Sequence, residues 1–241
     1  MIRMHLSEAA RVLKAKHSGR DAGFAGVSTD SRALERDNLF VALHGPHFDG
    51  HAFLDQAMQR GAAAALVDRA VETALPVMRV QDTRAGLGQL AAAWRARHTM
   101  PLVAVTGSNG KTTVKEMIAA ILSQRGPLLV TQGNLNNDIG VPLTLLRLER
   151  THRHAVIEMG ANHPGEIGYL TRIARPTVAL ITNAGPAHLE GFGSIEGVAR
   201  AKGEIYQGLS MDGIAVINSD DIYAPLWREL ADAHRVITFG L

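Results

Sequence analysis

The sequence VTGSNGKTT, residues 105–113, lies between an apolar stretch and a helical one, and it predicts the fold of the second half of the chain. The common phosphate-binding loop reads G-x-x-x-x-G-K-[ST] and connects a strand to a helix. Here Val105 stands six positions before Lys111, and the nearest upstream glycine, Gly107, lies only three positions before Gly110. The stretch is therefore either a shortened phosphate-binding loop or a glycine-rich turn that caps an ordinary helix.

The residue types of this loop suit phosphate binding. Successive backbone N–H groups and the positive end of a helix dipole attract anions. Glycine at 107 and 110 permits backbone angles and a close approach that a Cβ atom would prevent. Lys111 can reach the β- and γ-phosphates of a nucleotide, and the Thr112 hydroxyl can bind Mg²⁺. The strand–loop–helix setting favours nucleotide binding over the plain turn.

Apolar strands alternate with helices around the loop. The expected strands are LVAVT (102–106), LLVT (128–131), HAVIEM (154–159), TVALIT (177–182), GIAVIN (213–218) and RVITF (235–239). Strands that are apolar on both faces and alternate with helices predict a doubly wound, mostly parallel sheet with right-handed crossovers. The chain ends just after RVITF, where another crossover helix would follow, so we expect a domain that is cut short.

Residues 1–83 differ in texture and predict a separate, small α/β domain. We expect a helix at 7–16, a polar turn at 28–38, a strand at 39–43, a Gly- and His-rich loop at 44–51, a helix at 52–60 that ends at Gly61, and strands at 62–67 and 76–80. A helix at 83–98 follows as a connector. The predicted domains are therefore residues 1–83 and 84–241, both of the α/β class.

The composition excludes several classes of protein. The chain has 241 residues, a net charge of +2 and no cysteine, which excludes disulfides and thiolate metal sites. Lysine and arginine are scattered, so no basic stretch predicts nucleic-acid binding. No apolar run approaches the ~18 residues of a membrane span, and the N-terminus lacks the apolar region of a signal peptide. We expect a cytoplasmic monomer with no nucleic-acid or membrane partner.

Two further strand ends carry candidate metal ligands. Ligands bind at the carboxyl ends of the strands in a doubly wound sheet. Glu158 ends one predicted strand, and His188 follows another that ends near Asn183. Both side chains are candidate Mg²⁺ ligands beside Thr112, although histidine is an uncommon ligand for so hard an ion. The alternatives are a solvated strand end for Glu158 and one ordinary histidine among the 11 of this chain for His188.

The helix predicted at 194–209 carries a lysine in its apolar stripe. Ile195, Val198, Ile205 and Leu209 share one face, and Lys202 completes their helical spacing. Burial would lower the pKa of this lysine, and its neutral amine could then add CO₂ to give a carbamate that binds a metal. The alternative is that the aliphatic stem packs and the ammonium reaches water.

Together these segments resemble the Mur ligases, which build the cell-wall peptide. The resemblance covers nearly the whole chain and rests on STDSR, LFVALHGPHFDGHAF, TGSNGKTTVKEM, GNLNNDIGVPLTLL, EMGANHPGEI and NAGPAHLEGFGSIEGVARAKGEI. It implies an ATP-dependent ligase of peptidoglycan synthesis that phosphorylates the terminal carboxylate of UDP-N-acetylmuramoyl-tripeptide and couples it to D-alanyl-D-alanine. From this resemblance we expect the given sequence to correspond to the N-terminal domain and part of the central domain of the family, without the C-terminal domain.

The resemblance also implies roles for individual residues. Those that would bind the ATP phosphates are Gly107, Ser108, Asn109, Gly110, Lys111, Thr112 and Thr113. Thr112 and Glu158 would hold one Mg²⁺, and His188 with Lys202 as a carbamate would hold a second. Substrate contacts would come from Ser31, Arg32, Asp49, Gly50, His51, Asn134, Asn136 and Asn137. Without the resemblance, STDSR would be interpreted as a polar turn.

Three functions stay open. The chain is the N-terminal part of this ligase or of a sister Mur ligase that adds a different amino acid, it is a nucleotide-binding fragment without catalysis, or it is a generic P-loop ATPase or kinase. The last has no use for the STDSR and DGH segments.

Overall fold

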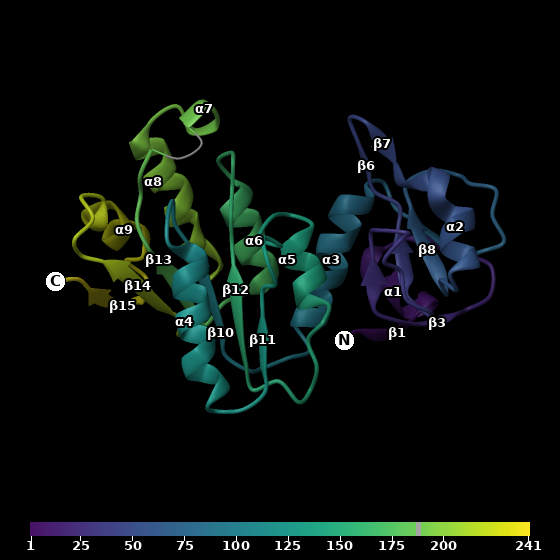
Figure 1. The fold of residues 1–241 in the computed structure, drawn as a ribbon, viewed down its shortest axis with the longest axis horizontal. Helices are drawn as coiled ribbons and strands as arrows, with labels where there is room; N and C mark the ends of the chain where they lie inside the picture. Colours follow the sequence, from purple (N-terminus) through teal and green to yellow (C-terminus); the bar gives the residue numbers. More distant parts are fainter. Residues whose placement is uncertain (187–188) are drawn as a thin grey trace. The chain divides into compact units, whose positions relative to one another are not determined.

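The computed structural model describes residues 1–186 and 189–241, which divide into two compact units (Figure 1). The first comprises Met1–Arg97 with Leu145–Glu149, and the second comprises His98–Thr144 with Arg150–Leu241. The first unit extends past the predicted boundary at residue 83, because helix α3 (Thr83–Arg95) packs against helix α1 (Leu6–Leu13) and strand β8 (Ala64–Val67).

The six strands predicted for the second unit are all present and form one sheet, which is parallel throughout the described residues. Its order is β11–β12–β10–β13–β14–β15. The bounds are β10 Leu102–Thr106, β11 Leu128–Val130, β12 His154–Glu158, β13 Val178–Ile181, β14 Ile214–Asn218 and β15 Arg235–Phe239. The connection after β10 leads toward one edge, to β11, whereas the connection after its neighbour β13 leads toward the other edge, to β14. Open α/β sheets bind ligands at such a switch point.

The helices of the second unit connect these strands. They are α4 Lys111–Ser123, α5 Gly140–Leu145, α6 Glu166–Ala174, α7 Leu189–Phe192, α8 Ile195–Gly203 and α9 Ala224–Leu230. Helix α4 packs against β10, β11 and β12, and Figure 1 shows it running alongside β10 and β11. No helix in the described part of the chain is long and apolar enough to cross a membrane.

The prediction of one helix at 194–209 is wrong for its second half. Helix α8 ends at Gly203, and a 3₁₀-helix, η2 (Glu204–Gly208), follows. In the predicted apolar stripe, Val198, Lys202 and Ile205 are buried. Ile195 lies in the first helical turn and is 37% exposed, and Leu209 lies beyond the helix and is partly buried. The stripe is therefore shorter than predicted, but Lys202 remains within it.

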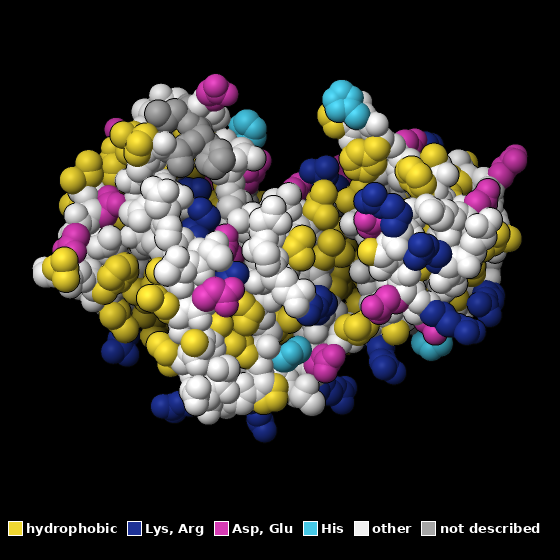
Figure 2. All heavy atoms as spheres, in the orientation of Figure 1, with side chains coloured by type: hydrophobic (Ala, Val, Ile, Leu, Met, Phe, Trp, Pro, Cys, Tyr) yellow, Lys and Arg dark blue, Asp and Glu magenta, His cyan; other side chains and the backbone are white. Residues whose placement is uncertain are grey.

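Burial in the sheet falls from its centre to one edge. Val105 on β10 and Ile157 on β12 are fully buried, whereas Ile237 and Phe239 on β15 are exposed. The prediction that every strand is buried on both faces is wrong for β15, because among the described residues this edge strand pairs with β14 only. Figure 2 shows hydrophobic side chains gathered at the β15 end of the unit.

The first unit contains a five-stranded sheet of order β2–β9–β8–β5–β4, in which β2 is antiparallel to β9 and the remaining pairs are parallel. Its other elements are two-stranded pairs, β1–β3 and β6–β7, and short helices. The bounds are β1 Arg3–His5, β2 Lys16–Ser18, β3 Gly23–Ala25, β4 Val27–Ser28, β5 Leu39–Val41, β6 His44–Gly45, β7 Phe48–Asp49, η1 Gly50–Phe53, α2 Leu54–Gln59 and β9 Val77–Arg79.

Helix ends in this unit follow the local backbone. Helix α1 ends three residues before the predicted position 16, because Lys14 adopts a left-handed conformation with φ 50° and donates its N–H to the carbonyls of Ala10 and Arg11. The prediction that Gly61 ends the next helix is confirmed: α2 ends at Gln59, and Gly61 follows with φ 88°.

Candidate active site

The glycine loop is fixed to the end of strand β13. The Ser108 N–H donates to Asn183 O, and the Asn109 N–H donates to Asn183 Oδ1, both at 3.0 Å. Gly107 has φ 148°, and a Cβ atom there would lie 1.9 Å from Thr182 Oγ1. Gly110 has φ 75° and immediately precedes helix α4. The loop thus sits between β10 and the first turn of α4, where unpaired N–H groups and the helix dipole favour an anion.

Lys111 folds back over this loop. Its Nζ donates to Gly107 O at 2.8 Å and to Ser108 O at 3.2 Å. Burial lowers the pKa of Lys111, and the charge of Glu158 opposes that shift. The side chain is therefore positioned at the loop, within reach of a phosphate that the loop would bind.

Glu158 is buried at the end of β12 and is held from three sides. Its Oε2 accepts a hydrogen bond from Thr112 Oγ1 at 3.0 Å, and its Oε1 accepts one from Asn136 Nδ2 at 2.8 Å. Its backbone N–H donates to Thr131 Oγ1 at 3.0 Å. The side chain is 2% exposed, so it is not the solvated strand end that we considered as the alternative. Thr112 and Glu158 are brought together as predicted.

The three predicted asparagines do not act alike. Asn136 reaches Glu158, whereas Asn137 Oδ1 accepts from the N–H groups of Ile139 and Gly140 at the start of α5. Asn134 is exposed, and its carbonyl accepts from Asn136 N. Of the three side chains, that of Asn136 contacts the Glu158 site, and that of Asn137 supports the neighbouring turn.

Lys202 is buried on α8 near the same loop. It is 2% exposed, and its Nζ lies 5.5 Å from the centre of the Phe192 ring. Burial, and to a smaller extent the charge of Lys111, lower its pKa to about 8, against the opposing effect of Glu166 and Glu204. The ammonium therefore does not reach water along its stem, and a substantial fraction of the amine is neutral near pH 8. His188, the other predicted ligand, lies outside the described residues.

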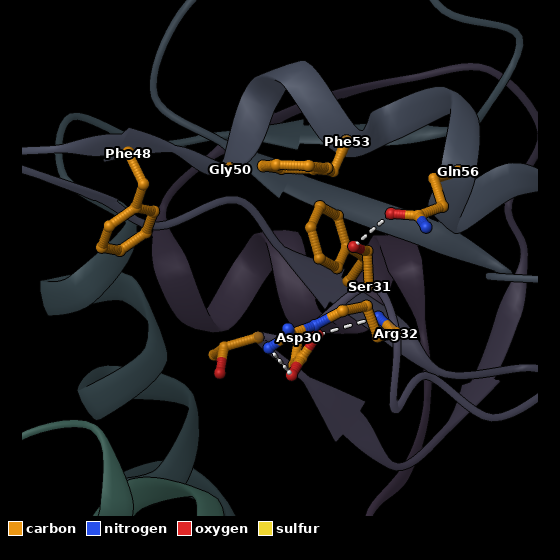
Figure 3. Close-up of a pocket in the computed structure, with 9 residues that line it drawn as sticks. Asp30, Ser31, Arg32, Phe48, Gly50, Phe53 and Gln56 are labelled. Atoms are coloured by element: carbon orange, nitrogen blue, oxygen red, sulfur yellow. Dashed lines mark hydrogen bonds and ion pairs between the residues drawn. The ribbon is translucent and has the colours of Figure 1, made fainter.

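A pocket in the first unit has a volume of about 420 Å³ (Figure 3). Three of the predicted substrate contacts, Ser31, Arg32 and Gly50, line it. Its other lining residues are Thr29, Asp30, Phe40, Phe48, Phe53 and Gln56. Ser31 Oγ donates to Gln56 Oε1 at 2.6 Å, and the Arg32 guanidinium donates to Asp30. Those bonds with Arg32 lower the pKa of Asp30 to about 2. Aromatic faces beside a fixed cation suit a ligand with a flat ring and phosphate groups.

Asp49 and His51 belong to a different network. The His51 ring lies between two aspartates: Nδ1 is 2.7 Å from Asp49 Oδ1, and Nε2 is 3.3 Å from the Asp68 backbone nitrogen and 3.2 Å from Asp68 Oδ1. Asp49 is also bonded to Arg69, which, together with His51, lowers the pKa of Asp49. Both residues line a second cavity of about 320 Å³ rather than the pocket of Ser31 and Arg32. The structure therefore places Asp49 and His51 outside the pocket that Ser31, Arg32 and Gly50 line.

Sequence reasoning missed several residues that shape these sites. In the second unit they are Lys115, Thr131 and Thr182, and in the first they are Phe48, Phe53 and Gln56. Lys115 lies one helical turn after Lys111, but the apolar pattern of the helix gives no signal for its burial. The aromatic residues of a Gly- and His-rich loop carry no comparable signal, since loop conformation decides where they point.

Two protein-family models match the chain. The Mur ligase middle domain matches residues 105–241, and the model described as Mur ligase family, catalytic domain, matches residues 23–95.

Relatives with names and solved structures agree with these matches. The chain is 50% identical over 240 residues to a UDP-N-acetylmuramoyl-tripeptide--D-alanyl-D-alanine ligase of Escherichia coli K12, covering 100% of this chain and 53% of that protein. It superposes on MurF from Acinetobacter baumannii with a TM-score of 0.96 at 40% identity, covering 100% of this chain and 54% of the other. For a MurF ligase from Thermotoga maritima in complex with ADP, the TM-score is 0.81 at 34% identity, covering 89% and 50%. The chain spans about half the length of the curated relatives it matches.

Proposed function

The chain belongs to the Mur ligase family, and we propose from this premise that it is the nucleotide-binding part of an ATP-dependent ligase. The proposed activity joins D-alanyl-D-alanine to the terminal carboxylate of UDP-N-acetylmuramoyl-tripeptide in peptidoglycan precursor synthesis. The observation that carries the proposal is the arrangement of Lys111, Thr112 and Glu158 around the loop that joins β10 to α4. The names of the similar ligases support the choice of substrates. A cytoplasmic location and a monomeric state remain predictions.

The proposed reaction has two steps, because a carboxylate is a poor electrophile. A carboxylate oxygen of the tripeptide attacks the γ-phosphorus of ATP, the bond from that phosphorus to the bridging oxygen breaks, and ADP leaves. The amine of D-alanyl-D-alanine then attacks the acyl carbon. The carbon–oxygen bond to phosphate breaks, and inorganic phosphate and a proton are released as the amide forms. Lys111 would offset the negative charge that gathers when the two anions meet.

The donor set at Glu158 fits Mg²⁺. This ion prefers hard oxygen ligands and is usually bound by one or two carboxylates together with water and substrate phosphates. Thr112 Oγ1 and Glu158 Oε2 lie 3.0 Å apart at the start of α4, next to the loop that would hold the phosphates. Within residues 1–186 and 189–241, no group of three His, Cys, Asp or Glu side chains forms an all-protein metal cage. When bound, Mg²⁺ would screen the phosphate charges and polarise the phosphoryl oxygens.

We also propose that Lys202 is carbamylated and supports a second Mg²⁺ with His188. The neutral amine would add to the carbon of CO₂ and lose one proton, which gives an anionic N–COO⁻ group. Burial of Lys202 and its lowered pKa support this step, because the amine must be neutral to react. The nearby charge of Lys111 would favour the anionic product. In ¹³CO₂-enriched buffer we expect a carbamate signal in the ¹³C NMR spectrum that Lys202→Ala removes, and its absence at saturating CO₂ would contradict the proposal.

The uridine diphosphate part of the substrate would occupy the pocket of Ser31 and Arg32. The volume of about 420 Å³ and its aromatic lining support a nucleotide base there, and Arg32 supports a phosphate. Asp49 and His51 would affect substrate binding indirectly, by holding strand β7 in place. In that strand Asp49 contacts His51, and its neighbour Phe48 lines the pocket.

Phosphate release tests the reaction. It should require ATP, UDP-N-acetylmuramoyl-tripeptide and D-alanyl-D-alanine together. Release with another amino acid but not with the dipeptide would favour a sister ligase. A second function is nucleotide binding without catalysis, which the anion-binding loop before α4 supports by itself. Calorimetric binding of the UDP-tripeptide to this chain without formation of ADP would support it, and ATP hydrolysis with no uridine-nucleotide affinity would indicate a generic ATPase.

A further inference from the structure

Lys115 is a buried lysine that the proposed reaction does not use. It lies on α4 and is 1% exposed, and its Nζ donates to Thr131 O at 3.0 Å. The same Nζ is 3.8 Å from Glu158 Oε2 and 3.0 Å from Glu116 Oε1. A buried ammonium is costly unless it is paired. Glu158 supplies a buried partner, whereas the Glu116 side chain is 63% exposed and largely solvated.

Helix α4 directs two side chains to one carboxylate oxygen. Thr112 and Lys115 are three residues apart, so they share a face of the helix, and both approach Glu158 Oε2. Thr131 completes the connection, because its carbonyl accepts from Lys115 and its hydroxyl accepts from the Glu158 N–H. Lys115 therefore links α4, β11 and the Glu158 carboxylate, which restricts how that carboxylate can turn.

We propose that Lys115 is a positioning residue that holds the Glu158 carboxylate in the orientation in which it binds a divalent cation together with Thr112. This inference rests on the proposed function, since it takes Glu158 as a cation ligand. Asn136 fixes the other oxygen, so the carboxylate is held at both ends before the cation arrives. Lys115 acts through Glu158 and does not contact the phosphate loop, so its loss weakens cation binding more than phosphate binding.

Metal and nucleotide binding can be measured separately. Free Mn²⁺ is followed by electron paramagnetic resonance in the presence of ADP, and ADP affinity without metal is measured by calorimetry in EDTA. Lys115→Met should weaken Mn²⁺ binding about 10- to 100-fold, the usual effect of removing a group that orients a ligand. ADP affinity in EDTA should change less than about threefold. Lys115→Arg should restore most of the Mn²⁺ affinity, and the control Glu116→Gln should leave it unchanged.

Two results would overturn the inference. One is wild-type Mn²⁺ affinity in Lys115→Met, and the other is an equal loss of ADP affinity with and without metal, which indicates a structural role. If Lys115→Met does not fold, the double variant with Glu158→Gln replaces the ion pair by neutral side chains and is compared with Glu158→Gln. Equal Mn²⁺ affinities support the inference, and a further loss of about tenfold overturns it. Wild-type protein that binds no Mn²⁺ with ADP would overturn the proposed function itself.

Discussion

Replacing Gly107 with alanine should destabilise the second unit and abolish tight nucleotide binding. The new Cβ would lie 1.9 Å from Thr182 Oγ1, which donates a 2.7 Å hydrogen bond to Asn109 O and must move. Overpacking of this kind costs about 1–3 kcal/mol, and the φ of 148° adds a backbone strain of about 1–3 kcal/mol. The expected loss is therefore about 2–6 kcal/mol in the free energy of unfolding, a large part of the about 5–15 kcal/mol of a typical protein.

Urea unfolding and ADP calorimetry measure the two effects, and the chain offers a matched control. Gly110 also has a positive φ, 75°, but a Cβ there would meet no atom within 4 Å. Gly110→Ala should therefore cost only the left-handed strain of about 1–2 kcal/mol. Thr182→Ala, added to Gly107→Ala, removes Oγ1 and leaves a Cβ at 3.1 Å, so it should recover part of the stability. Equal losses for the two glycines, without recovery in the double variant, would refute the steric explanation.

Three further predictions test other buried and exposed charges. The pKa of Lys202 is about 8 in the folded chain and 10.5 as its ordinary value, so between these pH values the unfolded chain retains a proton that the folded chain has released. The free energy of unfolding should rise with pH across this window by up to about 3 kcal/mol. When it is measured by urea unfolding in CO₂-free buffer at several pH values, Lys202→Met should remove this pH dependence. Arg32→Ala should change stability by less than about 1 kcal/mol, because its ion pair is solvated. It should also weaken UDP-tripeptide binding about tenfold in calorimetry. His51→Ala should lower the urea stability of the first unit by about 2 kcal/mol, because Asp49 and the partly buried Asp68 both lose their contacts with the buried ring.

The sheet of the second unit was predictable because each strand is an apolar run that ends at a polar residue. The same signal identified Glu158, which follows directly on such a run and is buried as a result. Lys202 was predictable because a lysine interrupts a helical apolar stripe. The exposure of strand β15 was not predictable. Its composition matches that of the central strands, and its position at the edge of the sheet depends on the whole chain.

Helix α4 shows where local patterns fail. Met117 and Ile121 are apolar and exposed, whereas Lys115 is buried on the same helix. The helix sequence alone would place these residues the other way round. The reason lies in β12, since Glu158 provides the charge that makes a buried lysine favourable. A pattern within one element does not contain that information, and the residues that correct it are far away in the sequence.

The predicted contacts of the three asparagines and of the DGH segment were only partly correct, for a related reason. Asn134 and Asn136 differ in role because a turn points one side chain outward and the other toward Glu158. In β7, Phe48 and Asp49 point to opposite sides, as neighbours in a strand do, so only Phe48 reaches the pocket of Ser31. Residue type and proximity in sequence indicated the right regions, and backbone direction decided which side chains reach the site.

The register between β10 and β12 fixes the distance between Glu158 and the strand that leads into the loop. Val105 and Glu158 are register partners, so the Glu158 backbone lies one strand spacing, about 4.8 Å, from the strand that leads into the loop. An inserted residue within β12 would turn Glu158 to the other side of the sheet and advance it by about 3.3 Å. Insertions at the opposite ends of the strands leave this register untouched. The lengths of those connections can therefore change without altering the position of Glu158 relative to the loop.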